Sequence, residues 1–262
     1  MSDPDRLWAD AMPQAYEKWL VPTVFRPFAV DLARRVRSRD PRRILELAAG
    51  TGVLTRELLH TGSDDVVATD LNVSMVATGR QFVPEAVWTQ ADALDLPFDA
   101  DEFDLVVCQL GVMFFPDKPA AFTQARRVLT PGGRLMVSVW ANLESHTFQA
   151  ALVDALTRVF PVDPPTFMTS IPHGYADLDV AVKDLRAAGF AEVTATTVTL
   201  EGRGRSAADL ATGYCAGTPL RAAIESRTDL RSATAAIARE MAVTLGEGAV
   251  TGRMTAHVIE AV

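Results

Sequence analysis

Short apolar runs alternate along this chain with segments whose apolar positions recur at helical spacing. Continuous apolar runs are typical of strands buried on both faces of a parallel sheet, and amphipathic segments between them are typical of crossover helices. Strands are predicted at residues 44–47, 66–69, 86–89, 103–108 and 134–140. Helices are predicted at residues 53–60, 75–80 and 118–129. The alternation predicts an α/β fold with helices on both faces of a mostly parallel sheet.

The regular alternation lapses after residue 140 and returns toward the end of the chain. Further helices are predicted at residues 147–160, 178–188 and within 206–246, and further strands at 191–200 and 252–262. A last strand that returns beside its predecessor runs antiparallel to the rest of the sheet. We expect segments 141–176 and 202–249 to be helical insertions that form a cap on a domain spanning 41–262.

Residues 1–40 are expected to form a separate N-terminal helical lid segment. Residues 7–37 look helical, and Pro13, Pro22 and Pro27 predict that this region is broken into short pieces. The segment is rich in aromatic side chains, namely Trp8, Tyr16, Trp19, Phe25 and Phe28. These rings either close over an apolar acceptor or simply pack a helix onto the core, and the sequence leaves both interpretations open.

Composition narrows the classes of protein. With 262 residues, 48% apolar residues and a mean hydropathy of +0.12, the chain can bury a substantial core. A net charge of −8 repels phosphate backbones, so we expect no nucleic acid partner. Two cysteines form no disulfide framework and no pattern of metal ligands. The beginning of the chain lacks the apolar region of a signal peptide, and no apolar run reaches membrane-spanning length, so we expect a cytoplasmic protein.

The segment around residues 44–55 carries the strongest chemical signal. An apolar strand contains Glu46 near its end, a loop of small residues with Gly50 and Gly52 follows, and a helix begins at Val53. Glycines allow a positive φ and a close approach of ligand to backbone, and the helix N-terminus presents unpaired N–H groups. This arrangement predicts a loop that holds a nucleotide-like cofactor.

Three further strands end in polar residues. Asp70 follows the second strand, Asp92 and Ala93 follow the third, and Gln109 ends the fourth. Ligands of open α/β sheets bind beyond the carboxyl ends of the strands, where the strand order reverses. A carboxylate at Asp70 can accept hydrogen bonds from both hydroxyls of a ribose, and one at Asp92 can accept from an adenine amino group.

These segments, taken in order, resemble the motifs of class I S-adenosylmethionine-dependent methyltransferases. The resemblance rests on the successive segments ELAAGTG, ATDLNVSMV, ADALDLPF, FDLVVCQLGVMFF and LTPGGRLMVSVW. It is closest to the small-molecule branch related to ubiquinone/menaquinone biosynthesis methyltransferases, and it covers residues 42–140 strongly. Ala48 stands where the family often has glycine. The resemblance implies a Rossmann-like sheet of seven strands whose last strand is antiparallel.

The resemblance also implies where S-adenosyl-L-methionine is held. Its methionine part would contact Glu46 and the loop residues Ala48, Gly50, Thr51 and Gly52. Its ribose would bind Asp70. Its adenine would lie against Leu71 and Met75 and be read by Asp92 and Ala93, while Gln109 would lie near the sulfonium.

A sulfonium methyl is already activated, so the protein has mainly to hold an acceptor in line and exclude water. A base helps if the acceptor atom is a weakly acidic OH or CH, and the candidates are Tyr16, His146 and His173, with Glu17 and Tyr214 also available. For each of these residues, a role at the surface or in packing is the more ordinary interpretation. Phe114 and Phe115, after the fourth strand, are candidates to line a pocket for a small, apolar or aromatic acceptor.

Other functions stay open beside this one. An NAD(P)-dependent oxidoreductase also has a glycine loop, but here Thr55 replaces its third glycine and Glu46 would face a pyrophosphate. A non-catalytic cofactor-binding or regulatory protein can share the fold. No Asn-Pro-Pro-Tyr or Asp-Pro-Pro-Tyr follows the fourth strand, which disfavours amide or adenine methylation. The sequence does not identify the acceptor, the methylated atom (O, C or N), an assisting metal or the oligomeric state.

Overall fold

The computed structural model describes residues 12–60, 62 and 65–262, and these fall into two compact units. The sheet unit consists of residues 28–141, 175–198 and 256–262. The helical unit consists of residues 12–27, 142–174 and 199–255. The expected division into a lid segment and a domain with two cap insertions stays a prediction, and Trp8 lies outside the described residues.

Seven strands form one sheet in the order β3-β2-β1-β4-β5-β7-β6. The strands are β1 (Ile44–Glu46), β2 (Val66–Asp70), β3 (Val87–Gln90), β4 (Phe103–Gln109), β5 (Leu129–Trp140), β6 (Val193–Gly204) and β7 (Val250–Ala261). Strands β1 to β5 are parallel to their neighbours, and β7 is antiparallel to β5. The expected Rossmann-like sheet with an antiparallel last strand is therefore confirmed.

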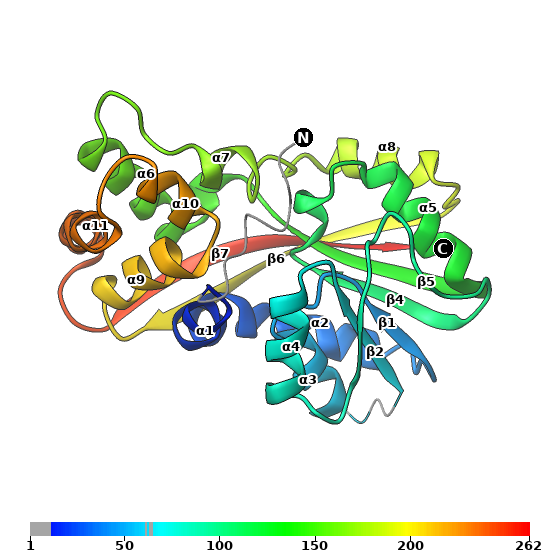
Figure 1. Cartoon of the computed structure of the whole chain (residues 1–262). Helices are drawn as coiled ribbons and strands as arrows, with labels where there is room; N and C mark the ends of the chain where they lie inside the picture. The colour runs from blue at the N-terminus through cyan, green and yellow to red at the C-terminus, as the bar shows by residue number, and fades with distance from the viewer. Residues whose placement is uncertain (1–11, 61, 63–64) are drawn as a thin grey trace. The chain divides into compact units, whose positions relative to one another are not determined.

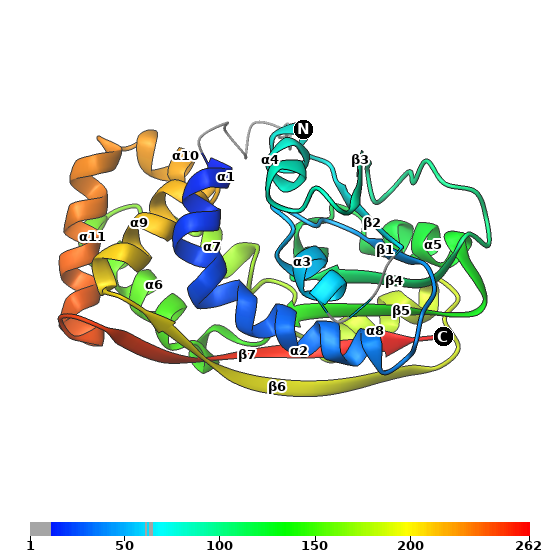
Figure 2. The same ribbon diagram turned by 90° about the horizontal axis from the view of Figure 1, so that it is seen from below.

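Helices flank the sheet and fill the helical unit (Figures 1 and 2). They are α1 (Met12–Ala15), η2 (Tyr16–Phe25), α2 (Arg26–Arg37), α3 (Val53–His60), α4 (Val73–Phe82), η3 (Val112–Phe114), α5 (Lys118–Val128), η4 (Leu143–Ser145), α6 (Thr147–Val159), α7 (Phe167–Ser170), α8 (Leu178–Ala187), α9 (Ala207–Gly217), α10 (Leu220–Glu225) and α11 (Leu230–Leu245). Within the sheet unit, α3 and α4 cover one face and α5 and α8 cover the other (Figures 1 and 2).

Local sequence signals fix the ends of the flanking helices. The side chain of Asn72 accepts a hydrogen bond from the Met75 N–H at 3.0 Å, and the side chain of Asp117 accepts one from Ala120 at 2.9 Å. Such caps satisfy amide groups that the first helical turn leaves without partners. The first cap begins α4 directly after β2, and the second begins α5 after the segment 110–117 that follows β4.

The N-terminal prolines do not break the chain into short pieces, contrary to the sequence expectation. Helical structure runs without interruption from Met12 to Arg37, and its middle part, η2, is a π-helix that contains Pro22. The N–H of Arg26 bonds to the carbonyl of Val21, five residues earlier. We attribute the continuity to the π-helix. Pro22 has no N–H to donate to the carbonyl four residues earlier, and the wider turns of a π-helix accommodate a residue without this hydrogen bond.

Strand β5 begins earlier than expected. The strand was expected at residues 134–140, but Leu129 already pairs with Phe103 of β4. The register then jumps, so that Leu105 pairs with Arg134 and the intervening residues loop out as an irregularity. Gly132, with φ +80°, makes this excursion possible.

In the helical unit, α11 packs against α6 and α9, and α9 packs against η2. A glycine allows the contact between α9 and η2, because a Cβ on Gly217 would lie 2.7 Å from the Tyr16 nitrogen.

The aromatic rings of the N-terminal segment form two different contacts. Tyr16 stacks on Phe25 with ring centroids 4.8 Å apart, whereas Phe28 is buried in the sheet unit with its edge against Trp140. Phe28 is thus a core residue.

None of the helices in the described part of the chain is both long and apolar enough to cross a lipid bilayer.

Candidate functional site

The glycine loop lies at the carboxyl end of β1, between β2 and β4. Its backbone is tied to both neighbours, since the Leu47 N–H donates to Val107 of β4 and the Ala49 N–H donates to Thr69 of β2, each at 2.8 Å. Strand order reverses at this point, because the chain continues from β1 to β2 and β3 on one side and occupies β4 and β5 on the other. The loop therefore sits at the switch point where open α/β sheets bind ligands.

The loop backbone leaves room for a ligand. Ala48, Gly50 and Gly52 all have positive φ, at +51°, +59° and +87°. A Cβ built on Gly50 would meet no atom within 4 Å beyond its chain neighbours, whereas one on Gly52 would lie 2.9 Å from the Trp88 ring. Gly52 thus packs the loop onto the core, and Gly50 faces open space where a ligand can approach the main chain.

Glu46 is buried beneath this loop, with 1% of its surface exposed. Its Oε2 accepts a hydrogen bond of 2.6 Å from Thr55 Oγ1. Burial raises the pKa of Glu46 to about 8, and the negative charge of Asp70 adds to this effect while the Thr55 bond opposes it. Thr55 was not predicted as a functional residue. The signal that could have identified it is its position, because it stands where a dinucleotide-binding loop has its third glycine. It is the partner that holds the Glu46 carboxyl.

Asp70 fastens the loop to the end of β2. Its Oδ2 accepts from the Gly50 N–H at 2.8 Å, and its Oδ1 accepts from the Asn72 N–H at 2.9 Å. Burial raises the pKa of Asp70, and the two N–H donors act against that rise. A carboxylate offers about four acceptor positions, so each oxygen keeps one for a further donor. The open space before Gly50 and these remaining positions fit the hydroxyls of a ribose.

The remaining predicted contacts lie near the ends of neighbouring strands. Leu71 is 39% exposed after β2, while Met75 is buried at the start of α4. Asp92 is exposed and its Oδ1 accepts from the Leu94 N–H at 2.9 Å, and Ala93 beside it is buried. Gln109 ends β4 in a buried position, as Thr51 is buried in the loop. The roles of these residues toward a cofactor stay predictions.

The three candidate bases lie in the helical unit. The rings of His146 and His173 meet edge to face, with centroids 4.6 Å apart. Both are buried, and His146 has no exposed surface. Tyr16 is half-buried against Phe25. The structure thus brings the rings of the two histidines together, and it brings the ring of Tyr16 against that of Phe25.

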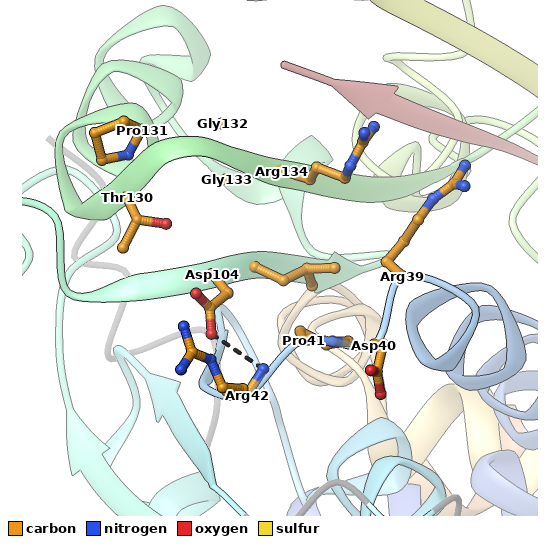
Figure 3. A pocket seen from close by; sticks show the side chains of 11 residues that line it. Arg39, Asp40, Pro41, Arg42, Asp104, Thr130, Pro131, Gly132, Gly133 and Arg134 are labelled. Carbon is orange, nitrogen blue, oxygen red and sulfur yellow. Dashed lines mark hydrogen bonds between the residues drawn. The ribbon is translucent and has the colours of Figure 1, made fainter.

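A shallow pocket of ≈ 250 Å³ in the sheet unit lies at the other ends of the strands (Figure 3). Its walls come from the segments that precede β1, begin β4 and begin β5, and it includes Arg39, Arg42 and Arg134. Arg39 and Arg134 are both paired with Glu260. The Arg42 N–H donates to Asp104 Oδ2 at 3.0 Å (Figure 3). This pocket contains none of the predicted cofactor contacts, so we assign it no part in the candidate site.

The fold agrees with comparisons to known proteins. A family model described as a methyltransferase domain matches residues 45–137. Demethylmenaquinone methyltransferase from Beutenbergia cavernae is 32% identical over 147 residues, which span 56% of this chain and 60% of that protein. Ubiquinone/menaquinone biosynthesis C-methyltransferase UbiE from a Shewanella species is 30% identical over 180 residues, 62% of this chain and 71% of that protein.

Among solved structures, phosphoethanolamine N-methyltransferase 2 from Haemonchus contortus, in complex with phosphomonomethylethanolamine and S-adenosylhomocysteine, matches with a TM-score of 0.63. The match covers 100% of this chain and 61% of that one, and at 14% identity it shows the fold alone. The chain belongs to the class I S-adenosylmethionine-dependent methyltransferases, resembles the UbiE enzymes among them, and uses S-adenosyl-L-methionine as its cofactor.

Proposed function

We propose that this methyltransferase transfers the methyl group to O, C or N of a small, apolar or aromatic organic acceptor. The observation that carries the proposal is the loop at the end of β1, whose open Gly50 and Asp70 carboxylate offer a place for the nucleoside of the methyl donor. The quinone-related names of the relatives support an aromatic acceptor. The expected absence of a nucleic acid partner stays a prediction.

In this proposal Glu46, Asp70 and the backbone of residues 48–52 in the sheet unit bind the cofactor. Asp70 accepts hydrogen bonds from the ribose hydroxyls, and the backbone of 48–52 lies along the methionine part. Glu46 places an acidic group below that loop, where a cationic ligand favours its ionised form. S-adenosyl-L-methionine supplies a methyl group on a positively charged sulfur. Transfer of this methyl group would break its S–C bond and release S-adenosylhomocysteine as a neutral thioether, so the main work of the protein is to hold the acceptor beside the methyl group and exclude water.

Tyr16, His146 and His173 stay proposed bases for an acceptor that loses a proton. Only a weakly acidic OH or CH requires such help. We also propose that the protein is located in the cytoplasm. Its two buried cysteines form no disulfide, which is compatible with a reducing compartment.

Calorimetric titration with S-adenosylhomocysteine, beside NADH, tests the assignment of the site. The unmodified protein should bind the former and not the latter. Asp70→Ala should weaken binding by about 1–3 kcal/mol, roughly five- to 150-fold, because the ribose donors and the Gly50 amide lose a charged acceptor.

Asp154→Ala is the matched control, because it removes an exposed carboxylate from helix α6 of the helical unit. Its affinity should equal that of the unmodified protein. An unchanged affinity in Asp70→Ala would contradict the ribose assignment, and binding of NADH alone would favour the oxidoreductase interpretation instead.

A further inference from the structure

The segment 110–115, which joins β4 to α5, is held in one conformation by several independent constraints. Leu110 has φ +53°, which is rare for a residue with a side chain, and its N–H donates to the Ser138 carbonyl at 3.0 Å. The short helix η3 follows, closed by a hydrogen bond of 3.0 Å from the Phe114 N–H to Gly111. Strain of this kind persists only where the surroundings fix it, and it is common at functional sites.

This segment contacts the cofactor loop directly. A Cβ on Gly111 would lie 2.6 Å from the Ala48 Cβ and 2.9 Å from the Cys108 sulfur. Only glycine fits so close to Ala48 without displacing it. The path of residues 110–115 is therefore set by the loop proposed to hold the methionine part of the cofactor.

Phe114 stands out in this segment by its exposure. Val112 and Met113, its neighbours in η3, are buried, whereas 37% of the Phe114 surface is exposed. A large apolar side chain displayed on a fixed turn next to a cofactor loop is suited to contact an apolar ligand.

A lysine secures the far end of the segment. Lys118 Nζ donates to the Phe115 carbonyl at 3.0 Å and lies 4.9 Å from the centre of the Tyr175 ring. The Tyr175 hydroxyl donates to Asp184 Oδ2 of helix α8 at 2.7 Å. Burial lowers the pKa of Lys118, while the nearby charges of Asp184 and Asp117 raise it. The ammonium group has exchanged part of its hydration for a carbonyl and an aromatic face.

We propose that Phe114 is the apolar contact that selects an aromatic methyl acceptor, and that Lys118, braced by Tyr175 and Asp184, is the positioning residue that keeps Phe114 beside the cofactor loop. The inference rests on the proposed function, because it presumes an acceptor bound near that loop. Lys118 acts through the backbone of Phe115 and needs no contact with the acceptor.

The test uses the complex of the full chain with S-adenosylhomocysteine and measures the Kd of 1-naphthol, a stable aromatic probe, with ethanolamine as a polar one. Phe114→Ala should raise the Kd of 1-naphthol about tenfold or more, the effect of losing a buried phenyl contact. Phe114→Leu should restore much of the affinity. Phe82→Ala, which removes another exposed phenylalanine at the end of α4, should leave the Kd unchanged.

Lys118→Met should raise the Kd of 1-naphthol as well, while S-adenosylhomocysteine binds as before. Combined with Phe114→Ala it should add almost nothing, because both changes remove the same contact. This non-additivity is a readout that a general loss of stability would not produce. Lys118→Arg should restore part of the affinity, since it keeps a cation near the carbonyl and the ring.

Three results would overturn the inference: no binding of 1-naphthol by the unmodified complex, no effect of Phe114→Ala, or effects of Phe114→Ala and Lys118→Met that multiply. In each case intact binding of S-adenosylhomocysteine leaves the cofactor assignment standing. Failure of the unmodified protein to bind S-adenosylhomocysteine would count against the proposed function itself.

Discussion

At the scale of single residues, Glu46 couples cofactor binding to pH. Its raised pKa of about 8 keeps it largely protonated at neutral pH in the free protein. The cationic amino group of S-adenosylhomocysteine, bound over the loop, would favour the ionised carboxylate and draw the pKa down. A proton then leaves on binding, so affinity should rise with pH until the free protein is itself ionised.

We expect the Kd of S-adenosylhomocysteine to fall as the pH rises from about 6, by up to about tenfold per unit, and to level off near 8. Titrations in two buffers of different ionisation enthalpy would detect the released proton. Glu46→Gln should give a flatter profile. An equally steep profile in that variant would assign the proton to another group.

Folding stability should respond to the same residue with the opposite sign. The pKa of Glu46 is raised from its ordinary 4.5, so folding favours its protonated form. That contribution is fully present below about 4.5 and is lost as the pH rises through about 8.

The sequence identifies some residues of the site and misses others for a physical reason. Glu46 and Asp70 lie at the carboxyl ends of strands, so their positions can be derived from the alternation of apolar runs. Lys118 and Tyr175 meet through packing of α5 and α8, which are distant in the chain. Periodicity predicts which face of a helix is buried but not which residue lies opposite it.

At the scale of elements, helix α4 and strand β3 pack together through Trp88, which also contacts the cofactor loop at Ala49. Trp88 of β3 donates its indole N–H to the Val83 carbonyl at 3.0 Å and packs with Ala49, Ala68 and Val76. A Cβ on Gly79 of α4 would lie 2.2 Å from the Trp88 ring. The close approach of this helix to the strand therefore depends on glycine.

Gly79→Ala should lower the free energy of unfolding by about 1–3 kcal/mol, measured by urea denaturation. Alanine in a helix interior usually stabilises by about 1 kcal/mol relative to glycine, but overpacking against the rigid indole exceeds this gain. Trp88→Phe should relieve the clash, so the double variant should be more stable than the two single effects predict. A stabilised Gly79→Ala protein would show that α4 can shift freely.

Elements with local signals were predicted well. Helix α3 has the expected bounds, and helix α8 begins at the expected residue, with Asp177 as its cap. The continuous winding through Pro22 was not predicted, because a π-helix relies on hydrogen bonds that the surrounding packing selects rather than on a residue pattern.

At the scale of the whole molecule, the two units share continuous elements. Helix α2 and strands β6 and β7 each begin in one unit and end in the other. A strand or helix that crosses a boundary makes independent unfolding of the two sides costly, because its hydrogen bonds would have to break partway along.

We therefore expect a single calorimetric transition on heating, for both units together. S-adenosylhomocysteine at 100 times its Kd should raise the free energy of unfolding by about 2.7 kcal/mol and move the whole transition upward. Two transitions, of which the ligand moves only one, would show that the units unfold separately.

The position of β7 between β5 and β6 has a consequence for biosynthesis. The ribosome makes β5 and β6 before the strand that joins them, so the sheet cannot close while residues 250–261 are still within the exit tunnel. Until then both strands carry unsatisfied backbone edges, which are sites of unwanted pairing between chains. We therefore expect the edges of β5 and β6 that face β7 to be the places where a chain lacking a paired β7 associates with other chains.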